Sequence, residues 1–218
     1  FTGSNDTGVQ LAKKGARTEV MLTATQKPSR RADVLVINTE SRAISAAQAE
    51  QAVQQALAPW CDSASVPLVY KKIDSTFRGN VGAEVTAAMR ATSRRLAVIA
   101  AAIPAAGRTT LDGLCLVNGT PLLETEFASD PKTPIISSRI AELVALQSDI
   151  PVHEVSLEDV RRGRLSALLS AFAKESECMV VTDAVEDRDL SLIAQAICEQ
   201  NQLPLLVGAA GLANALPV

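Results

Sequence analysis

Residues 71–80 carry a dense set of chemically active side chains directly after a predicted strand. The apolar run at 67–70 is typical of a buried strand, and KKIDSTFRGN follows it. This stretch holds two ammonium groups, a carboxylate, two hydroxyls and a guanidinium. In open α/β sheets, ligands bind beyond the carboxyl ends of the strands. We therefore expect Lys72, Asp74 and Arg78 to contribute to a site for a small hydroxylated anion.

The geometry of a strand refines this expectation. Side chains alternate between faces, so Lys72 and Asp74 should share one face and Lys71 the other. Asn80 can cap the helix that follows, whose N-terminus favours an anion. The simpler alternative is a surface ion pair between Lys72 and Asp74, worth roughly 0–1 kcal/mol. The density of donors and acceptors favours a site.

Two further strand ends carry charged residues. Glu40 and Arg42 lie between a predicted strand and helix. Arg42 near a helix start is unfavourable for the helix dipole, which suggests that it is placed for a carboxylate or phosphate; a solvated arginine is the alternative. Gly107, Arg108 and two threonines follow another strand. We expect groups near 42, 72–78 and 108 to converge on one pocket.

The elements that position these residues alternate between strand and helix. We predict strands at 17–22, 33–38, 67–70, 96–103, 152–155, 178–183 and 203–207. We predict helices at 7–14, 43–58, from 81 onward, 136–146, 165–174 and 187–200, with polar loops at 1–6 and 23–31 and a turn-like segment at 157–164. The continuous apolar run of strand 33–38 predicts that helices cover both of its faces. This pattern indicates an α/β fold with a doubly wound, mostly parallel sheet and helices on both faces. A β-hairpin insertion around 111–134, built on the Asn-Gly turn at 118–119, should border the crevice.

Composition and charge exclude several classes of protein. A net charge of −3 and few aromatic residues argue against nucleic-acid binding. No apolar run reaches the roughly 20 residues of a membrane span. The four cysteines are scattered without a CxxC pair, so we predict no metal site and reduced thiols in a cytoplasmic protein. The single histidine, His153, is expected to be structural.

The familiar nucleotide-binding motifs are missing from the chain. It contains neither GxxxxGK[ST] nor GxGxxG. A GxxG at 208–211 could hold a phosphate at a helix N-terminus, but close packing of helix on strand explains it as well. The chain opens at Phe1 rather than at a methionine, and we expect it to be one domain, residues 1–218, of a longer protein.

Several stretches together resemble a known family. They are NTESR, YKKIDSTFRGNVGAE, IPAAGRTT, VNGTPLLETEFASDP and VGAAGLA, in this order along the chain. The chain resembles the N-terminal domain of the four-carbon acid sugar kinases, including the D-threonate and D-erythronate kinases. The likeness covers essentially the whole chain. The opening FTGSNDTG is similar to the tail of the family's ADDxTGxxD motif, without its alanine and two aspartates, and Asp6 matches the later aspartate.

The resemblance implies an activity for the parent protein. It would transfer the γ-phosphoryl group of ATP, with Mg²⁺, to a hydroxyl of a four-carbon sugar acid. This domain would hold the sugar acid, a C-terminal kinase domain would hold most of the nucleotide, and the fragment alone would be inactive. A homo-oligomer is left open. The implied or expected substrate contacts are Arg42, Lys72, Ile73, Asp74, Ser75, Arg78 and Arg108, with Asp74 a candidate for the catalytic base.

Two other functions remain open from the residues alone. A stand-alone binding or sensor module for a small hydroxy acid would use the same site without chemistry. A dinucleotide-dependent oxidoreductase would need a GxGxxG that the chain does not contain.

Overall fold

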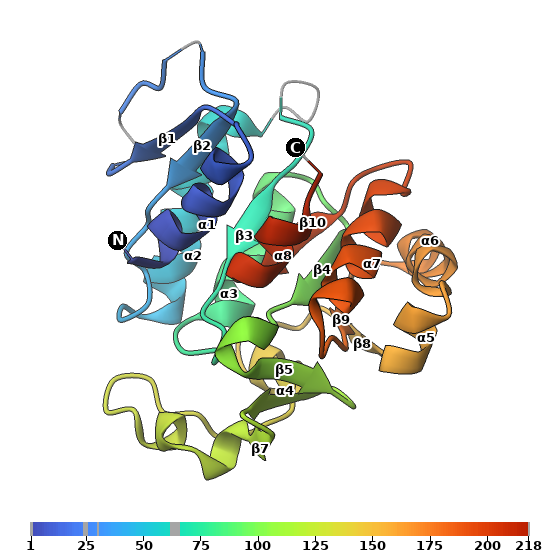
Figure 1. Ribbon diagram of the computed structural model, residues 1–218. Helices are drawn as coiled ribbons and strands as arrows, with labels where there is room; N and C mark the ends of the chain where they lie inside the picture. Colours follow the sequence, from blue (N-terminus) through green and yellow to red (C-terminus); the bar gives the residue numbers. More distant parts are fainter. Residues whose placement is uncertain (1, 24–25, 30, 62–65, 218) are drawn as a thin grey trace.

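The computed structural model describes residues 2–23, 26–29, 31–61 and 66–217, and its centre is a five-stranded parallel sheet. The strand order is β3-β10-β4-β9-β8 (Figure 1). The bounds are β3 Tyr70–Lys72, β4 Leu96–Ala100, β8 Val152–Val155, β9 Cys178–Thr182 and β10 Leu205–Gly208. Every residue of β4, β9 and β10 is buried, as a continuous apolar run predicts for a parallel sheet covered on both faces.

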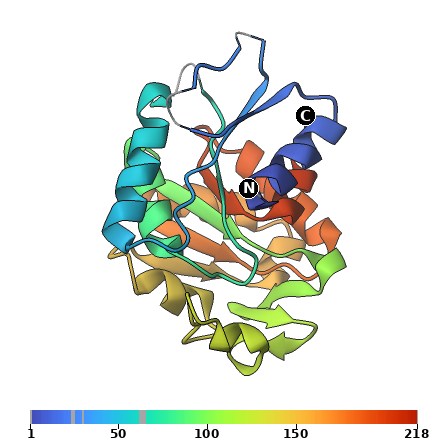
Figure 2. The same ribbon diagram turned by 90° about the vertical axis from the view of Figure 1, so that its left-hand side faces the viewer.

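Helices cover both faces of this sheet. Neighbouring strand residues alternate between two apolar clusters, so Val98 packs into one and Ile99 into the other. On one face lie α2 Ala46–Leu57, α3 Val81–Ala91 and α4 Ile140–Ala145. On the other lie α5 Leu157–Arg161, α6 Leu165–Glu175, α7 Asp187–Cys198 and α8 Ala210–Ala215. Figure 2 shows the strands between these two layers. The predicted doubly wound α/β fold is confirmed.

Strands β1 Thr18–Met21 and β2 Val34–Ile37 form a separate two-stranded parallel sheet. Helix α1, Thr2–Lys13, packs on both strands. The prediction that strand 33–38 is covered on both faces is wrong, because all four residues of β2 are only half-buried. Its apolar sequence matches an interior strand, but its second neighbour is absent from the described residues.

The insertion after β4 is larger than the predicted hairpin. Strands β6 Leu114–Val117 and β7 Thr120–Pro121 pair in antiparallel fashion across Asn118 and Gly119, whose φ angles are 50° and 81°. Positive φ at both positions is what a two-residue hairpin requires. A third strand, β5 Arg108–Leu111, pairs with β6. Short 3-10 turns, η3 Leu122–Glu124 and η4 Glu126–Ser129, complete the segment.

Three local predictions are wrong. The buried strand predicted at 67–70 begins only at Tyr70, as β3, and is half-buried. The polar residues 2–6 belong to α1 rather than to a loop, and the turn-like segment 157–164 contains α5. Ser156 caps α5, because its side chain accepts a hydrogen bond from the backbone N–H of Asp159, and the sequence reasoning missed this signal. Part of the predicted loop 23–31 lies outside the described residues.

Two further 3-10 turns are η1 Ala58–Trp60 and η2 Pro104–Ala106. Among the described residues no helix has the length and apolarity to cross a membrane.

Candidate functional site

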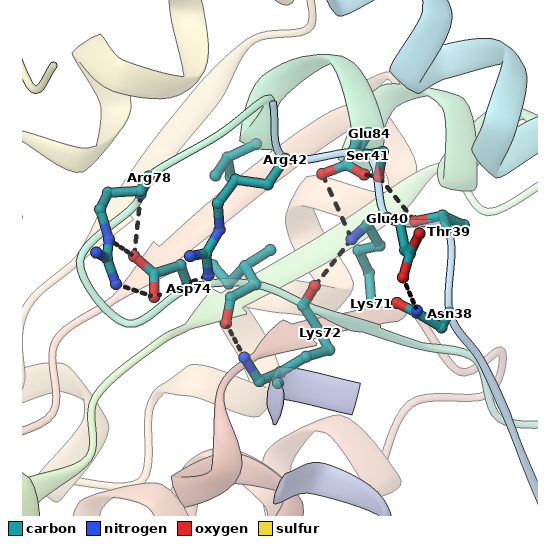
Figure 3. A pocket seen from close by; sticks show the side chains of 13 residues that line it. Asn38, Thr39, Glu40, Ser41, Arg42, Lys71, Lys72, Asp74, Arg78 and Glu84 are labelled. Atoms are coloured by element: carbon teal, nitrogen blue, oxygen red, sulfur yellow. Dashed lines mark hydrogen bonds and ion pairs between the residues drawn. The ribbon is translucent and has the colours of Figure 1, made fainter. Parts of the chain in front are cut away.

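A pocket of about 270 Å³ lies beyond the carboxyl ends of β2 and β3 (Figure 3). The segment after β2 forms one wall, and the end of β3 with the following loop forms another. The first turns of α1 and α3 complete it. The lining residues are Gly3, Asn38, Thr39, Glu40, Ser41, Arg42, Lys71, Lys72, Ile73, Asp74, Arg78, Val81 and Glu84.

The Asp74 carboxylate receives hydrogen bonds from three side chains. Arg78 donates through Nε to Oδ2 at 2.8 Å, and the Thr76 hydroxyl donates to the same oxygen at 2.6 Å. Arg42 reaches Oδ1 at 3.5 Å. Burial alone would raise the pKa of Asp74, but hydrogen bonds from Arg78 and Thr76 and the nearby charges outweigh it and lower the pKa to about 2. Asp74 is therefore ionised at neutral pH and is a weak proton acceptor.

Arg42 lies in the segment between β2 and α2, before the Ser45 N-cap of α2, and not at the helix start itself. The Asn80 side chain holds this segment by donating to the carbonyls of Ser41 and Ile44 at 2.9 and 2.8 Å. Asn80 does not cap α3 with its side chain, contrary to prediction. Gly79 has φ +98°, and a Cβ there would lie 3.0 Å from Cγ of Arg42. The chain thus packs closely beneath Arg42, and the positive φ of Gly79 favours glycine at this position.

The side chains of the two lysines of β3 lie on opposite faces of the strand, one toward α3 and the other toward α1, as strand alternation predicts. Lys71 extends toward Glu84 of α3, with Nζ 3.7 Å from Oε2. The Nζ of Lys72 lies against Gly3 of α1 and donates to the carbonyl of Ile73 at 2.8 Å. Burial lowers the pKa of Lys72, although the negative charges of Asp74 and Asp6 partly offset this effect by raising the pKa.

Glu84 belongs to the pocket, and the sequence reasoning missed it. Its side chain is buried in the first turn of α3, where it accepts a hydrogen bond from the Ser41 hydroxyl and pairs with Lys71. The available signal was an acidic residue at a helix N-terminus, where the helix dipole favours negative charge. That signal is common in ordinary helices and does not distinguish a pocket residue.

Arg42, Lys72, Ile73, Asp74 and Arg78 line the pocket together, whereas two predicted contacts do not. The Ser75 carbonyl lies near Cys115 Sγ, at 3.6 Å. The Arg108 guanidinium donates to the carbonyl of Ala106 and lies 5.5 Å from the centre of the Phe127 ring. The three loops therefore do not all converge, because β5 turns Arg108 toward the insertion.

The insertion is nevertheless tied to the pocket through Arg78. The Arg78 guanidinium lies 5.3 Å from the centre of the Phe127 ring and 3.6 Å from the carboxylate of Asp130. The same side chain holds Asp74 on its other side. None of the described residues that line the pocket belongs to the insertion, so it meets the predicted crevice through its contacts with Arg78.

The GxxG at 208–211 serves close packing. A Cβ at Gly208 would lie 2.7 Å from the carbonyl oxygen of Ala100, and one at Gly211 would lie 2.3 Å from that of Ala102. His153 stacks on Phe172 with ring centres 4.2 Å apart, which fits the structural role predicted for it.

The described residues contain no group of three or more His, Cys, Asp or Glu side chains that could hold a metal ion. In the pocket, Asp74 is paired with arginines and Glu84 with Lys71. A divalent cation would have to compete with these cations.

Comparisons with known proteins identify the family of the chain. A family model described as a sugar-binding N-terminal domain matches residues 1–216. The chain is 80% identical over 218 residues to a D-threonate kinase of Salmonella typhimurium and 39% identical over 201 residues to a D-erythronate kinase of Heliobacterium modesticaldum. It spans about half of these relatives, 52% and 45% of their lengths.

Solved structures share the fold. A DUF1537 protein of Haemophilus influenzae has a TM-score of 0.89 and 26% identity, and the match covers 99% of this chain and 53% of that one. A Bordetella bronchiseptica protein with bound citrate, a domain-swapped dimer, has a TM-score of 0.85 and 34% identity, with the same coverage.

Proposed function

Because the chain belongs to the family of sugar-binding N-terminal domains, we propose that it is the substrate-binding half of an ATP-dependent kinase acting on D-threonate or a closely related four-carbon sugar acid. The observation that carries the proposal is the pocket that joins Arg42, Lys72 and Asp74 at the ends of two strands. The high identity to a D-threonate kinase supports the choice of substrate class.

Arg42 is the residue that we assign to the substrate carboxylate. Its side chain is 54% exposed, and its one polar contact with the described residues is a long one, 3.5 Å, to Asp74. Most of its N–H groups therefore remain available to a ligand in the pocket. A guanidinium can bind a carboxylate through two parallel hydrogen bonds, which fixes the orientation of the sugar acid as well as its position.

Asp74 and Lys72 act at the other end of the substrate. The ionised Asp74 carboxylate accepts hydrogen bonds from substrate hydroxyls and orients the one that attacks. Its low pKa makes it a weak base, which suits phosphoryl transfer, because that reaction depends on positioning and charge neutralisation more than on covalent help. Lys72 supplies a compact positive charge for the incoming phosphoryl group. Arg78 holds Asp74 in place.

ATP and Mg²⁺ belong, in this proposal, mainly to the other half of the parent protein. The chain spans 52% of the Salmonella relative, which leaves room for a C-terminal kinase domain. Residues 1–218 would be one sugar-acid-binding domain, and the parent would be a cytoplasmic enzyme. The domain-swapped dimer of the Bordetella relative supports an oligomeric parent, and its bound citrate, a hydroxylated carboxylate, fits the ligand class.

Calorimetry with D-threonate tests the assignment of the pocket. The 218-residue chain should bind D-threonate weakly, and Arg42→Ala should weaken binding about 10-fold or more, because a hydrogen bond to a charged group contributes roughly 1.5–3 kcal/mol. Arg90→Ala is the matched control, since Arg90, on α3, is exposed and pairs with Glu177 outside the pocket. Equal affinities for the unaltered chain and Arg42→Ala would refute the site.

Activity measurements test the reaction. The parent protein should consume ATP in the presence of D-threonate and form a phosphorylated product, whereas the 218-residue chain should not. D-erythronate and 3-oxo-tetronate, the substrates in the names of other relatives, should be poorer substrates. A parent that binds D-threonate without consuming ATP would instead be a binding or sensor module.

A further inference from the structure

The guanidinium of Arg78 lies between the pocket and the insertion and is held on three sides. Toward the pocket, Nε and Nη2 donate to the two carboxylate oxygens of Asp74, at 2.8 and 3.3 Å (Figure 3). Toward the insertion, Nη1 lies 3.6 Å from Oδ2 of Asp130. The guanidinium also lies over the Phe127 ring, 5.3 Å from its centre. Because a guanidinium is planar and its N–H groups point in fixed directions, these contacts together fix its orientation.

The Asp130 carboxylate is itself positioned by the backbone that follows it. Its Oδ1 accepts the N–H groups of Lys132 and Thr133, both at 2.9 Å. An aspartate that bonds the backbone two residues on forms a turn of its own. The turn occupies Oδ1 and leaves Oδ2 to face Arg78. One carboxylate therefore has two tasks, because it orders the insertion with one oxygen and holds Arg78 with the other.

The Phe127 ring supports the guanidinium from the insertion. Phe127 belongs to η4 and packs against the apolar cluster that α3 shares with the sheet. A second guanidinium, that of Arg108 on β5, lies 5.5 Å from the centre of the same ring. A cation within about 6 Å of an aromatic ring centre is attracted by the face of the ring. Arg108 thus does not reach the pocket, but it helps to hold the ring on which Arg78 lies.

The orientation of the Asp74 carboxylate depends on Arg78. Three of the five hydrogen bonds that it receives from described residues come from the backbone N–H, Nε and Nη2 of Arg78. A rotation of the guanidinium would therefore turn the carboxylate with it. In the proposed function, Asp74 orients the attacking hydroxyl and Arg42 holds the substrate carboxylate. A disturbance of Arg78 should then act on the chemical step and spare the affinity for the sugar acid.

We propose, on the basis of the proposed function, that Asp130 is a positioning residue of the reaction: it sets the orientation of Arg78, and through Arg78 that of Asp74. Phe127 supports the same guanidinium from its face. Neither Asp130 nor Phe127 lines the pocket, so each acts through Arg78. The insertion thereby contributes to the rate of phosphoryl transfer without contacting the sugar acid.

Single-turnover kinetics of the parent protein with D-threonate and ATP test the proposal. Asp130→Asn retains an oxygen that can accept the turn N–H groups but removes the charge that faces Arg78. The single-turnover rate at saturating substrates should fall about 10-fold, because small misplacements of reacting groups cost up to about 100-fold. The KM for D-threonate should stay within about 2-fold, since uniform binding is untouched.

Glu126→Gln is the matched control, because Glu126 is an exposed carboxylate of the same insertion. It should change neither the rate nor the KM. An unaltered rate for Asp130→Asn in an active parent would overturn this inference alone, as would a loss confined to the KM. An unaltered parent that does not consume ATP with D-threonate would instead refute the proposed function.

A double-variant cycle separates positioning from a role in folding alone. Arg78→Met should lower the single-turnover rate at least as much as Asp130→Asn. If Asp130 acts through Arg78, adding Asp130→Asn to Arg78→Met should cause no further loss. Equal losses in both backgrounds would overturn the proposal, because a role in the turn at 130–133 persists without Arg78.

The support from the ring is tested at Phe127. Phe127→Leu keeps an apolar side chain but removes the aromatic face, so the single-turnover rate should fall. Phe127→Tyr keeps the face and should retain the rate. Equal rates in the two variants would overturn the role of the ring.

Discussion

The Nε of Arg78 lies 2.8 Å from Oδ2 of Asp74, and this pair links the floor of the pocket to the insertion. Arg78 follows Asp74 by four residues in the loop between β3 and α3. The loop therefore closes on itself around the carboxylate, and Thr76 and Arg42 contribute the remaining contacts. A single charged group thus orders the loop and lines the pocket.

Replacement of Asp74 by asparagine should destabilise the protein in a pH-dependent manner. The folded-state pKa of Asp74 is lowered from 3.8 to about 2, so its contribution is fully present above pH 4 and is lost as the pH falls toward 2. The shift corresponds to about 2 kcal/mol. Urea unfolding should show this difference between Asp74→Asn and the unaltered protein at pH 6, and a smaller difference at pH 3.

Asp149→Asn is the control for this series, because Asp149 is exposed. It should leave the free energy of unfolding nearly unchanged at both pH values. A stability difference for Asp74→Asn that stays constant from pH 6 to pH 3 would contradict the ionised, hydrogen-bonded state of Asp74.

Gly79→Ala should reduce sugar-acid affinity by moving Arg42. Gly79 and Gly15 have nearly equal φ angles, +98° and +96°, but only a Cβ at Gly79 would meet Arg42. Both alanine variants should lose about 1 kcal/mol of stability from backbone strain. Calorimetry should show about a 10-fold weaker affinity for D-threonate in Gly79→Ala alone. Equal affinities in the two variants would mean that Arg42 does not need this support.

The Lys71–Glu84 pair should show strong coupling in a double-mutant cycle. Both side chains are largely buried, with exposed fractions of 17% and 10%, so removing one charge leaves the other uncompensated. Lys71→Met and Glu84→Gln should each cost about 3 kcal/mol in the free energy of unfolding. The double variant should cost clearly less than the sum. Additive losses, measured by chemical denaturation, would argue that the two groups do not interact.

Gly211→Ala should destabilise the fold severely without a specific effect on phosphate binding. Its Cβ would lie 2.3 Å from a backbone carbonyl, which cannot move as a side chain can. We expect a loss of about 3 kcal/mol, against about 1 kcal/mol for Gly163→Ala, where φ is +71° but the space is open. Thermal unfolding measures both. A stable Gly211→Ala protein with impaired ATP use in the parent would favour phosphate binding at this turn.

Several predictions that rest on local interactions agree with the structure. The runs that became β4 and β9 are apolar on both faces because both faces are covered, and this is visible in the residues themselves. The Asn118-Gly119 turn follows from the backbone angles that these residues tolerate. The clustering of Lys72, Asp74 and Arg78 after one strand was likewise visible as a short-range pattern.

Contacts between distant segments were harder to predict. Arg108 follows a strand end as Arg42 does, yet β5 carries it to the insertion and away from the pocket. Glu84 looked like an ordinary helix residue until the segment after β2 placed Ser41 against it. The half-buried state of β2 depends on its edge position in a two-stranded sheet and not on its own apolar sequence.

The sequence by itself determined the α/β alternation, the positions of most elements and the types of side chain at each strand end, because propensity, turn chemistry and apolar periodicity act over a few residues. Only the tertiary structure decided that Arg42 and Lys72 line one pocket while Arg108 does not, and that the sheet is interrupted beside it. Those outcomes depend on which strands become neighbours, and strand order is set by packing between segments far apart in the chain.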